Sequence, residues 1–162
     1  MTSKLTHFDD QGRAQMVDVS DKKSTVRVAI AKGSLKISNQ LCEILTQGTL
    51  AKGDAFTVAK TAGIIGAKKT GELIPMCHPL GIDQIEILTE LNEKEARIYV
   101  TATVRCEGKT GVEMEALTAV SITTLTLYDM CKAVDKEMMI EQIGLARKTG
   151  GKSGDFTNPA FS

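Results

Sequence analysis

The stretch 97–133, RIYVTATVRCEGKTGVEMEALTAVSITTLTLYDMCKA, decides the fold of this chain. Residues 98–106 alternate apolar and polar side chains, which is the period of a strand with one buried face. A glycine-framed turn, 108–111, then leads into residues 112–133, which we predict to form one long helix. A strand that runs directly into a helix of this length indicates that helices pack on a sheet.

Further strands are predicted on both sides of this stretch. Residues 25–31 alternate through Val26, Val28 and Ile30, which is the period of a half-buried strand. The segment 16–19 could form a short pairing strand in an otherwise polar amino-terminal region. The remaining predictions are a strand over 85–89, a hairpin turn over 92–95 that joins it to 98–106, and a last strand over 138–145.

Two helices are predicted between the first two long strands. Ser34 or Ser38 is a suitable N-cap for a helix that runs toward Gly48. Asp54 is a suitable N-cap for the second helix. Small residues recur at every fourth position of that second helix and favour close packing against another backbone: Ala59, Gly63 and Ala67.

This order of elements predicts an α+β sandwich in which helices cover one face of an antiparallel sheet. The chain has 162 residues, of which 42% are apolar and 25% charged, so it is long enough for one domain with its own core. We therefore expect a single domain over residues 1–162. It would carry an amino-terminal arm over 1–23 and a flexible, glycine-rich tail over 148–162.

Composition limits the partners of this domain. Its 20 basic and 20 acidic residues give no net charge, which argues against non-specific binding to nucleic acid. Aromatic residues make up 4% and Trp is absent, so a base-stacking platform is not expected. No apolar run is long enough to span a bilayer, and the polar amino terminus lacks the apolar region of a signal peptide. We expect a cytoplasmic protein with no membrane partner.

The cysteines are widely spaced and form no CxxC pair, so a zinc or dithiol site has little support. We expect reduced thiols at all four positions: Cys42, Cys77, Cys106 and Cys131. Cys77 stands beside His78 in the segment 74–80, whose two prolines exclude a helix. His78 could bind phosphate, transfer a proton or ligate a metal, whereas the other histidine, His7, lies in the arm. A Cys77/His78 metal site stays open as an alternative.

Ionisable side chains lie at both ends of the predicted long helix. Glu113 and Glu115 occupy its first turn, where the helix dipole favours carboxylates and where one of the two can face a pocket. Asp129 and Lys132 stand three residues apart near the other end, so their side chains share a face. A surface ion pair explains this spacing. Their apolar neighbours instead favour a partly buried pair that transfers protons.

Basic residues among glycines flank the same helix. Residues 108–110, Gly-Lys-Thr, are not a phosphate-binding P-loop, because that motif needs a glycine five residues earlier and Thr103 stands there. A turn before a helix N-terminus could still help to hold an anion. Lys148 and Lys152 lie among the glycines of the tail. That composition is typical of a flexible loop and also of a segment that folds over a phosphate.

Taken together, these motifs identify a family. The chain resembles the cyclic pyranopterin monophosphate synthases, the family of molybdenum cofactor biosynthesis accessory protein C. The matching motifs follow one another in the expected order over nearly the whole chain. They are MVDVS (16–20), KGD (52–54), IPMCHPL (74–80), GKTGVEMEALTA (108–119), LYDMCKAV (127–134) and GGKSGDF (150–156).

The resemblance implies a ferredoxin-like α+β fold in a single catalytic domain. It also implies a homohexamer, built as a trimer of dimers with active sites at subunit interfaces. The implied reaction converts 3′,8-cyclo-7,8-dihydro-GTP to cyclic pyranopterin monophosphate with release of pyrophosphate. This chemistry requires proton transfer and stabilised negative charge, and it demands no metal and no redox cofactor.

The resemblance also implies roles for individual residues. Asp129 is the implied catalytic acid residue, and Lys52 and Lys132 are the implied proton-transferring lysines, a role that a lowered lysine pKa would favour. The residues implied to line the substrate are Met76, Cys77, His78, Met114 and Glu115. Three more are weaker candidates for the same role: Glu113, Lys148 and Lys152.

The spacing of these residues raises a question about the site. A helix rises about 21 Å from Glu115 to Asp129, which is too far for one small pocket to be lined by both ends of one copy. Either the substrate spans that length, or the two ends serve different pockets that neighbouring subunits complete. A non-catalytic nucleotide-binding or scaffold protein of the same fold is the alternative function.

Overall fold

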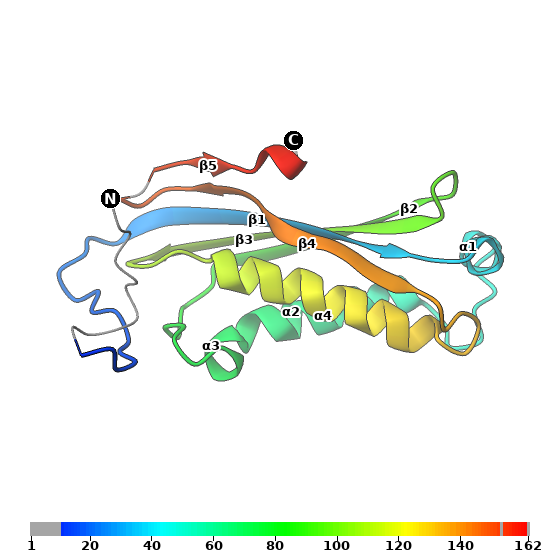
Figure 1. Ribbon diagram of the computed structural model, residues 1–162, viewed down its shortest axis with the longest axis horizontal. Coiled ribbons are helices and arrows are strands. Elements are labelled where there is room, and N and C mark those ends of the chain that lie inside the picture. The colour runs from blue at the N-terminus through cyan, green and yellow to red at the C-terminus, as the bar shows by residue number, and fades with distance from the viewer. Residues whose placement is uncertain (1–10, 153, 162) are drawn as a thin grey trace.

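The computed structural model describes residues 11–152 and 154–161. The described residues form a sheet with helices on one of its faces, and α1 lies at one end of the sheet (Figure 1). The elements are β1 (Thr25–Lys36), α1 (Asn39–Thr46), α2 (Ala55–Lys68), α3 (Thr70–Leu73), β2 (Gln84–Asn92), β3 (Arg97–Gly108), α4 (Glu113–Cys131), β4 (Met139–Thr149), β5 (Phe156–Thr157) and the 3-10 helix η1 (Pro159–Phe161).

The sheet topology is that of the ferredoxin-like fold. The strands lie in the order β2-β3-β1-β4-β5, and every neighbouring pair is antiparallel. Helices α1 to α3 connect β1 to β2, and α4 connects β3 to β4, which gives the βαββαβ order of that fold. The predicted α+β fold class is therefore confirmed.

The predicted alternation in β3 places its apolar side chains in the core. Ile98, Val100, Ala102, Val104 and Cys106 are each at most 1% exposed. In α4 the fully buried side chains include Val120 and Leu127, which face this layer. Burying an aliphatic side chain of this size stabilises the fold by roughly 1.5–3 kcal/mol.

Small residues let α2 approach α4 closely, as its sequence predicts. Ala59, Gly63 and Ala67 are all buried. A Cβ atom at Gly63 would collide with the Thr123 hydroxyl and would lie 2.9 Å from the Ala119 carbonyl oxygen. Glycine at position 63 is thus required by packing between the two helices.

The first strand is longer than predicted and buries its other face. β1 continues through Gly33, where a Cβ would lie 2.7 Å from Val120 Cγ1 and 2.9 Å from Ile143 Cγ1. Glycine here makes room for α4 and does not end the strand. The helix-facing side chains are small, Ala29 and Ala31 among them, whereas the alternating set Val26, Val28 and Ile30 lies on the opposite face.

The predicted N-caps are partly confirmed. Ser38 caps α1 by accepting a hydrogen bond from the Leu41 amide (3.2 Å), whereas the other candidate, Ser34, lies within β1. Asp54 caps α2 by accepting from the Thr57 amide at 3.0 Å. The predicted long helix matches α4 to within two residues at each end.

Both terminal regions differ from their predicted structure. The segment 16–19 forms neither a strand nor a helix. Lys148 and Thr149 end β4, and β5 pairs with that strand through Phe156 and Lys148. Part of the predicted flexible tail is therefore built into the sheet. Residues 1–10, with His7 among them, lie outside the described residues.

Candidate active site

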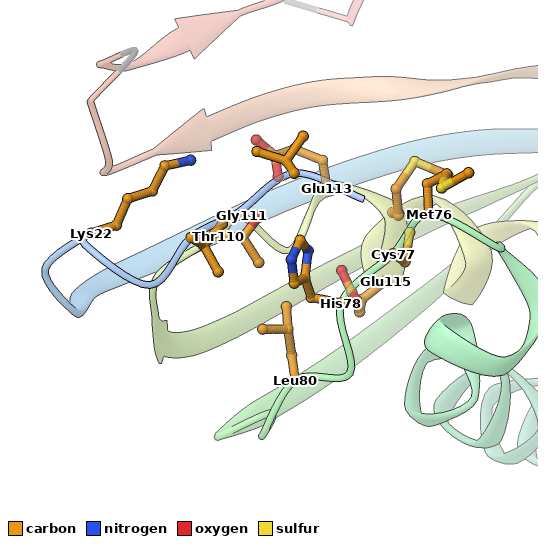
Figure 2. Close-up of a pocket in the computed structure, with 12 residues that line it drawn as sticks. Lys22, Met76, Cys77, His78, Leu80, Thr110, Gly111, Glu113 and Glu115 are labelled. Atoms are coloured by element: carbon orange, nitrogen blue, oxygen red, sulfur yellow. The ribbon is translucent and has the colours of Figure 1, made fainter. Parts of the chain in front are cut away.

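A cavity of about 300 Å³ lies where the loop after α3 meets the start of α4. Figure 2 shows the imidazole of His78 at its centre, with Thr110 on one side and Cys77 and Glu115 on the other. The segment 74–80 is not helical, as its two prolines predict, and a turn closed by the hydrogen bond from the Cys77 amide to the Ile74 carbonyl (3.0 Å) precedes His78. The cavity is lined by Val17, Val19, Lys22, Met76, Cys77, His78, Leu80, Thr110, Gly111, Glu113, Met114 and Glu115.

Two of these residues have a shifted pKa. Glu115 is only 4% exposed, and this burial raises the pKa of its carboxyl group above the ordinary value. Burial also raises the pKa of the Cys77 thiol, and the nearby charge of Glu115 adds to that shift. The thiol is therefore a poor nucleophile here, and Glu115 is the carboxyl group best able to hold a proton inside the cavity.

Glu113 lies at the rim of the cavity and is fixed by two neighbours. Its carboxylate occupies the space beside Gly111, where any side chain would collide with it. Its Oε1 lies 3.6 Å from Lys148 Nζ, so the first turn of α4 is tied to the end of β4. Two residues predicted as weaker candidates thus form one ion pair at the site.

A larger groove adjoins this cavity and carries most of the nearby positive charge. It has a volume of about 720 Å³ and shares Lys22, Thr110, Gly111 and Glu113 with the first cavity. Its other lining residues are Asp21, Lys23, Thr25, Arg27, Lys109, Lys148, Gly151 and Lys152. Six cationic side chains face two carboxylates in this groove, so it favours an anion although the chain has no net charge.

A second cluster of charge lies at the far end of α4. Lys52 precedes α2 in a turn, and its Nζ donates to the carbonyl oxygen of Asp129 at 2.8 Å. Lys132 Nζ lies 2.7 Å from Oδ1 of the same residue, Asp129. The structure therefore brings together Lys52, Asp129 and Lys132.

This cluster is exposed, contrary to expectation. The side chains of Lys132 and Asp129 are 53% and 61% exposed, because the helical period turns their apolar neighbours Leu127 and Cys131 into the core. The hydrogen bond from Lys132, together with its charge, lowers the pKa of Asp129. The same hydrogen bond raises the pKa of Lys132, so the partly buried pair with a lowered lysine pKa is not present in the isolated chain.

The described residues of one chain do not place the two clusters around a single cavity. Glu115 lines the cavity at the start of α4, whereas Asp129 lies about 21 Å further along the helix. Among the described residues, the cavities beside the start of α4 are not lined by Lys52, Asp129 or Lys132.

Comparison with known proteins assigns the family. The model of the MoaC family matches residues 16–151, which is most of the chain. The chain belongs to the MoaC family. Its cavity and its exposed cluster lie within the matched residues, as does the basic groove except for Lys152.

Curated relatives resemble this MoaC-family chain over nearly its whole length. A cyclic pyranopterin monophosphate synthase of Clostridium botulinum is 56% identical over 158 residues, which are 98% of this chain and 99% of that protein. The protein of the same name from Brevibacillus brevis is 54% identical over 156 residues, covering 96% and 97%. That of Clostridium perfringens is also 54% identical over 156 residues, covering 96% and 99%.

Sequence reasoning missed several lining residues of this MoaC-family site. Val17 and Val19 were predicted to pair in a strand, and the side chains of both instead line the cavity. Lys22 and Arg27 were not singled out. Arg27 stands on the helix-facing side of β1, and its position there follows from the register only once the buried face of that strand is known.

Two further findings concern the described residues of this MoaC-family chain. They contain no group of three or more His, Cys, Asp or Glu side chains that could hold a metal ion, so a Cys77/His78 metal site gains no support. Among the same residues, no helix combines the length and the apolar character needed to cross a membrane.

Proposed function

We propose that this chain converts 3′,8-cyclo-7,8-dihydro-GTP to cyclic pyranopterin monophosphate and releases pyrophosphate, as a step of molybdenum cofactor biosynthesis in the cytoplasm. Membership of the MoaC family supports this function, as do relatives of that name that are 51–56% identical over nearly their full length. The enzyme is accordingly a lyase that acts on a small molecule.

The observation that carries this proposal is the pairing of two unlike cavities. The smaller one, around His78, has apolar, sulfur-containing and carboxyl side chains, which suit a reduced ring system that must be held and protonated. The larger one has six cationic side chains and adjoins it through Lys22 and Thr110. A ring joined to a triphosphate fits such a pair of cavities. The ring would lie beside His78 and Glu115, and the triphosphate beside the cationic side chains of the groove.

In the ring cavity, His78 and Glu115 are the groups that can exchange protons with the substrate. Glu115 keeps a raised pKa because it is buried, so it can donate a proton closer to neutral pH than an exposed carboxyl group can. Met76, Cys77 and Met114 give this cavity polarizable walls without introducing charge. These residues position the ring while its bonds rearrange.

In the groove, the cations stabilise the phosphates and the departing pyrophosphate. Closing the cyclic phosphate transfers one phosphorus from the pyrophosphate oxygen to a substrate hydroxyl oxygen, and the hydroxyl proton passes to a base. Negative charge therefore accumulates on the leaving group, where Lys148, Lys152 and Arg27 can stabilise it. The Glu113–Lys148 ion pair can open to release the lysine to the substrate.

Asp129, Lys52 and Lys132 are the proposed catalytic group, and a second copy of the chain supplies them. One chain holds the two halves of the site at opposite ends of α4, so a neighbour must bring its lysine cluster to the ring cavity. The proposed assembly is a homohexamer, a trimer of dimers with its sites at the interfaces. Burial there would remove the cluster from water and lower the pKa of a lysine within it.

A mass-spectrometric assay with the cyclo-dihydro-GTP substrate tests the function. The purified chain should yield the cyclic phosphate and one equivalent of pyrophosphate. Asp129→Asn and Lys52→Ala should abolish this turnover and keep the fold. A chain that binds the substrate and leaves it unchanged would be a nucleotide-binding or scaffold protein instead, and wild-type turnover by both variants would overturn the site assignment.

A further inference from the structure

Residues 16–23, here called the strap, lie across the site and belong to neither the sheet nor the helices. Val17 and Val19 line the ring cavity, and Lys22 lines both that cavity and the basic groove. Met16 lines a third, adjoining cavity of about 280 Å³ that shares Cys77 with the first. One short segment thus contributes to the lining of three adjoining cavities.

Within the described residues, the strap is mostly exposed and belongs to no helix or strand. Only Val17 and Val19 are half-buried, and its other residues are exposed. Internally it forms a turn, in which the Ser20 amide donates to Asp18 Oδ1 (2.8 Å) and the Lys22 amide donates to the Val19 carbonyl (3.1 Å). Neither bond joins the strap to the rest of the molecule.

Lys109 ties the strap to the body of the protein. Its Nζ donates to the carbonyl oxygen of Ser20 at 2.7 Å, across 89 positions of sequence. The pKa of Asp18 is lowered by its hydrogen bonds to Ser20 and, to a smaller extent, by the nearby charge of Lys109. An ammonium group that is engaged by a carbonyl at this distance has one fewer donor to offer a phosphate.

The backbone of Lys109 is itself held by Arg27. Arg27 Nε donates to the Gly108 carbonyl at 3.0 Å, and its Nη2 donates to the Lys109 carbonyl at 3.2 Å. The guanidinium also fills the space beside Gly151, where a side chain would collide with it. The backbone of Lys109 is therefore held in place. Because it is held, the single hydrogen bond from its side chain to Ser20 can position the strap.

We propose that Lys109 is a positioning residue, which holds the strap so that Val17 and Val19 roof the ring cavity and exclude water. The inference rests on the proposed function. The exclusion of water from the cavity matters because closing the cyclic phosphate requires a substrate hydroxyl to attack phosphorus. Water that attacks the same atom would also expel pyrophosphate, yet it would leave a linear monophosphate.

Limited proteolysis tests whether Lys109 holds the strap, and it does not depend on catalytic activity. Trypsin cleaves after lysine, and Lys22 and Lys23 lie in the strap. Lys109→Met should speed cleavage there about tenfold or more, because a lost bond to a charged donor frees the segment. Lys109→Arg, which keeps a donor, should restore much of the protection, and Lys94→Met in the β2–β3 turn should behave as wild type. Unchanged cleavage of Lys109→Met would overturn the proposal.

A double-mutant cycle then separates positioning from direct binding of phosphate. Lys109→Met and the pair Val17→Ser with Val19→Ser should each lower kcat/KM and raise the ratio of linear to cyclic product. If Lys109 acts through the strap, the combined variant should be no worse than the poorer parent. Multiplied losses with no linear product would mean that Lys109 contacts the phosphates instead. If the wild-type chain formed no cyclic product, the proposed function would be wrong. The proteolysis result would still show whether Lys109 holds the strap.

Discussion

Glu115 and Asp129 lie at opposite ends of α4, about 21 Å apart along the helix axis, and only Glu115 is buried. The buried carboxyl group lines the ring cavity, and the exposed one is paired with Lys132 on the surface of the chain. We propose that these are the two halves of one site and that each is incomplete in a single chain. Each half-site has chemistry that the other lacks, which is the basis of the proposal that two copies share a site.

Removing the exposed cluster should cost activity and not stability. Asp129→Asn, Lys52→Ala and Lys132→Ala should each lower kcat at least about a hundredfold, which is the scale for lost proton transfer. Within one chain the free energy of unfolding should stay close to that of the wild type, because ion pairs that are exposed on the chain contribute little to its stability. Steady-state kinetics and calorimetry check both points. Glu90→Gln on β2 is a matched exposed control, and a comparable loss in that variant would refute the assignment.

Loss of a groove lysine should weaken binding of the triphosphate. Lys148→Met and Lys152→Met should each raise KM about tenfold or more, since each removes a charge-assisted contact with the phosphates. Inorganic triphosphate should compete with substrate for the wild type and compete less well for these variants. Lys94→Met serves as the control. Equal inhibition constants in all four proteins would show that the groove does not hold the phosphates.

Glu115 should make stability fall as pH rises. Its pKa is raised by burial, so between the ordinary value of 4.5 and the raised value the folded chain keeps a proton that the unfolded chain has lost. Unfolding then releases a proton, and the free energy of unfolding decreases with increasing pH in that window. Glu115→Gln cannot titrate, so its stability relative to wild type should rise through the window. Urea denaturation at several pH values would contradict this if the difference stayed flat.

A side chain at Gly63, where α2 packs against α4, should destabilise the fold. Gly63→Ala would force a Cβ into the Thr123 hydroxyl and the Ala119 carbonyl, and should lower the free energy of unfolding by about 1–3 kcal/mol. Gly81→Ala is the matched control, because nothing lies within 4 Å of the added Cβ. Denaturant titration that found both variants equally stable would refute this packing.

The sequence predicts the core of the fold well, because its strongest patterns are local. The alternation of β3 and the length of α4 are set by side chains whose period matches their element. The buried face of β1 could not be predicted, since Ala29 and Ala31 are less apolar than Val26 and Val28. Small residues are needed on that face because α4 packs closely against it.

The sequence predicts several residues that the structure brings together, but it does not predict how they are arranged. His78 and Glu115 do line one cavity, and Lys52 does reach Asp129. Val17 and Val19 alternate with polar residues as in a strand, but both side chains line the cavity and neither residue belongs to a strand. Contacts of this kind join segments that are far apart in sequence, so no local pattern signals them.

Mixing two inactive variants tests the shared site most directly. His78→Ala disables the ring cavity and Asp129→Asn disables the lysine cluster, each on its own chain. If a site takes one half from each of two copies, co-assembly in equal amounts should give about a quarter of the sites two intact halves and restore about that share of turnover. Native mass spectrometry would confirm that the chains had mixed. Mixed oligomers as inactive as their parents would contradict a site shared between copies.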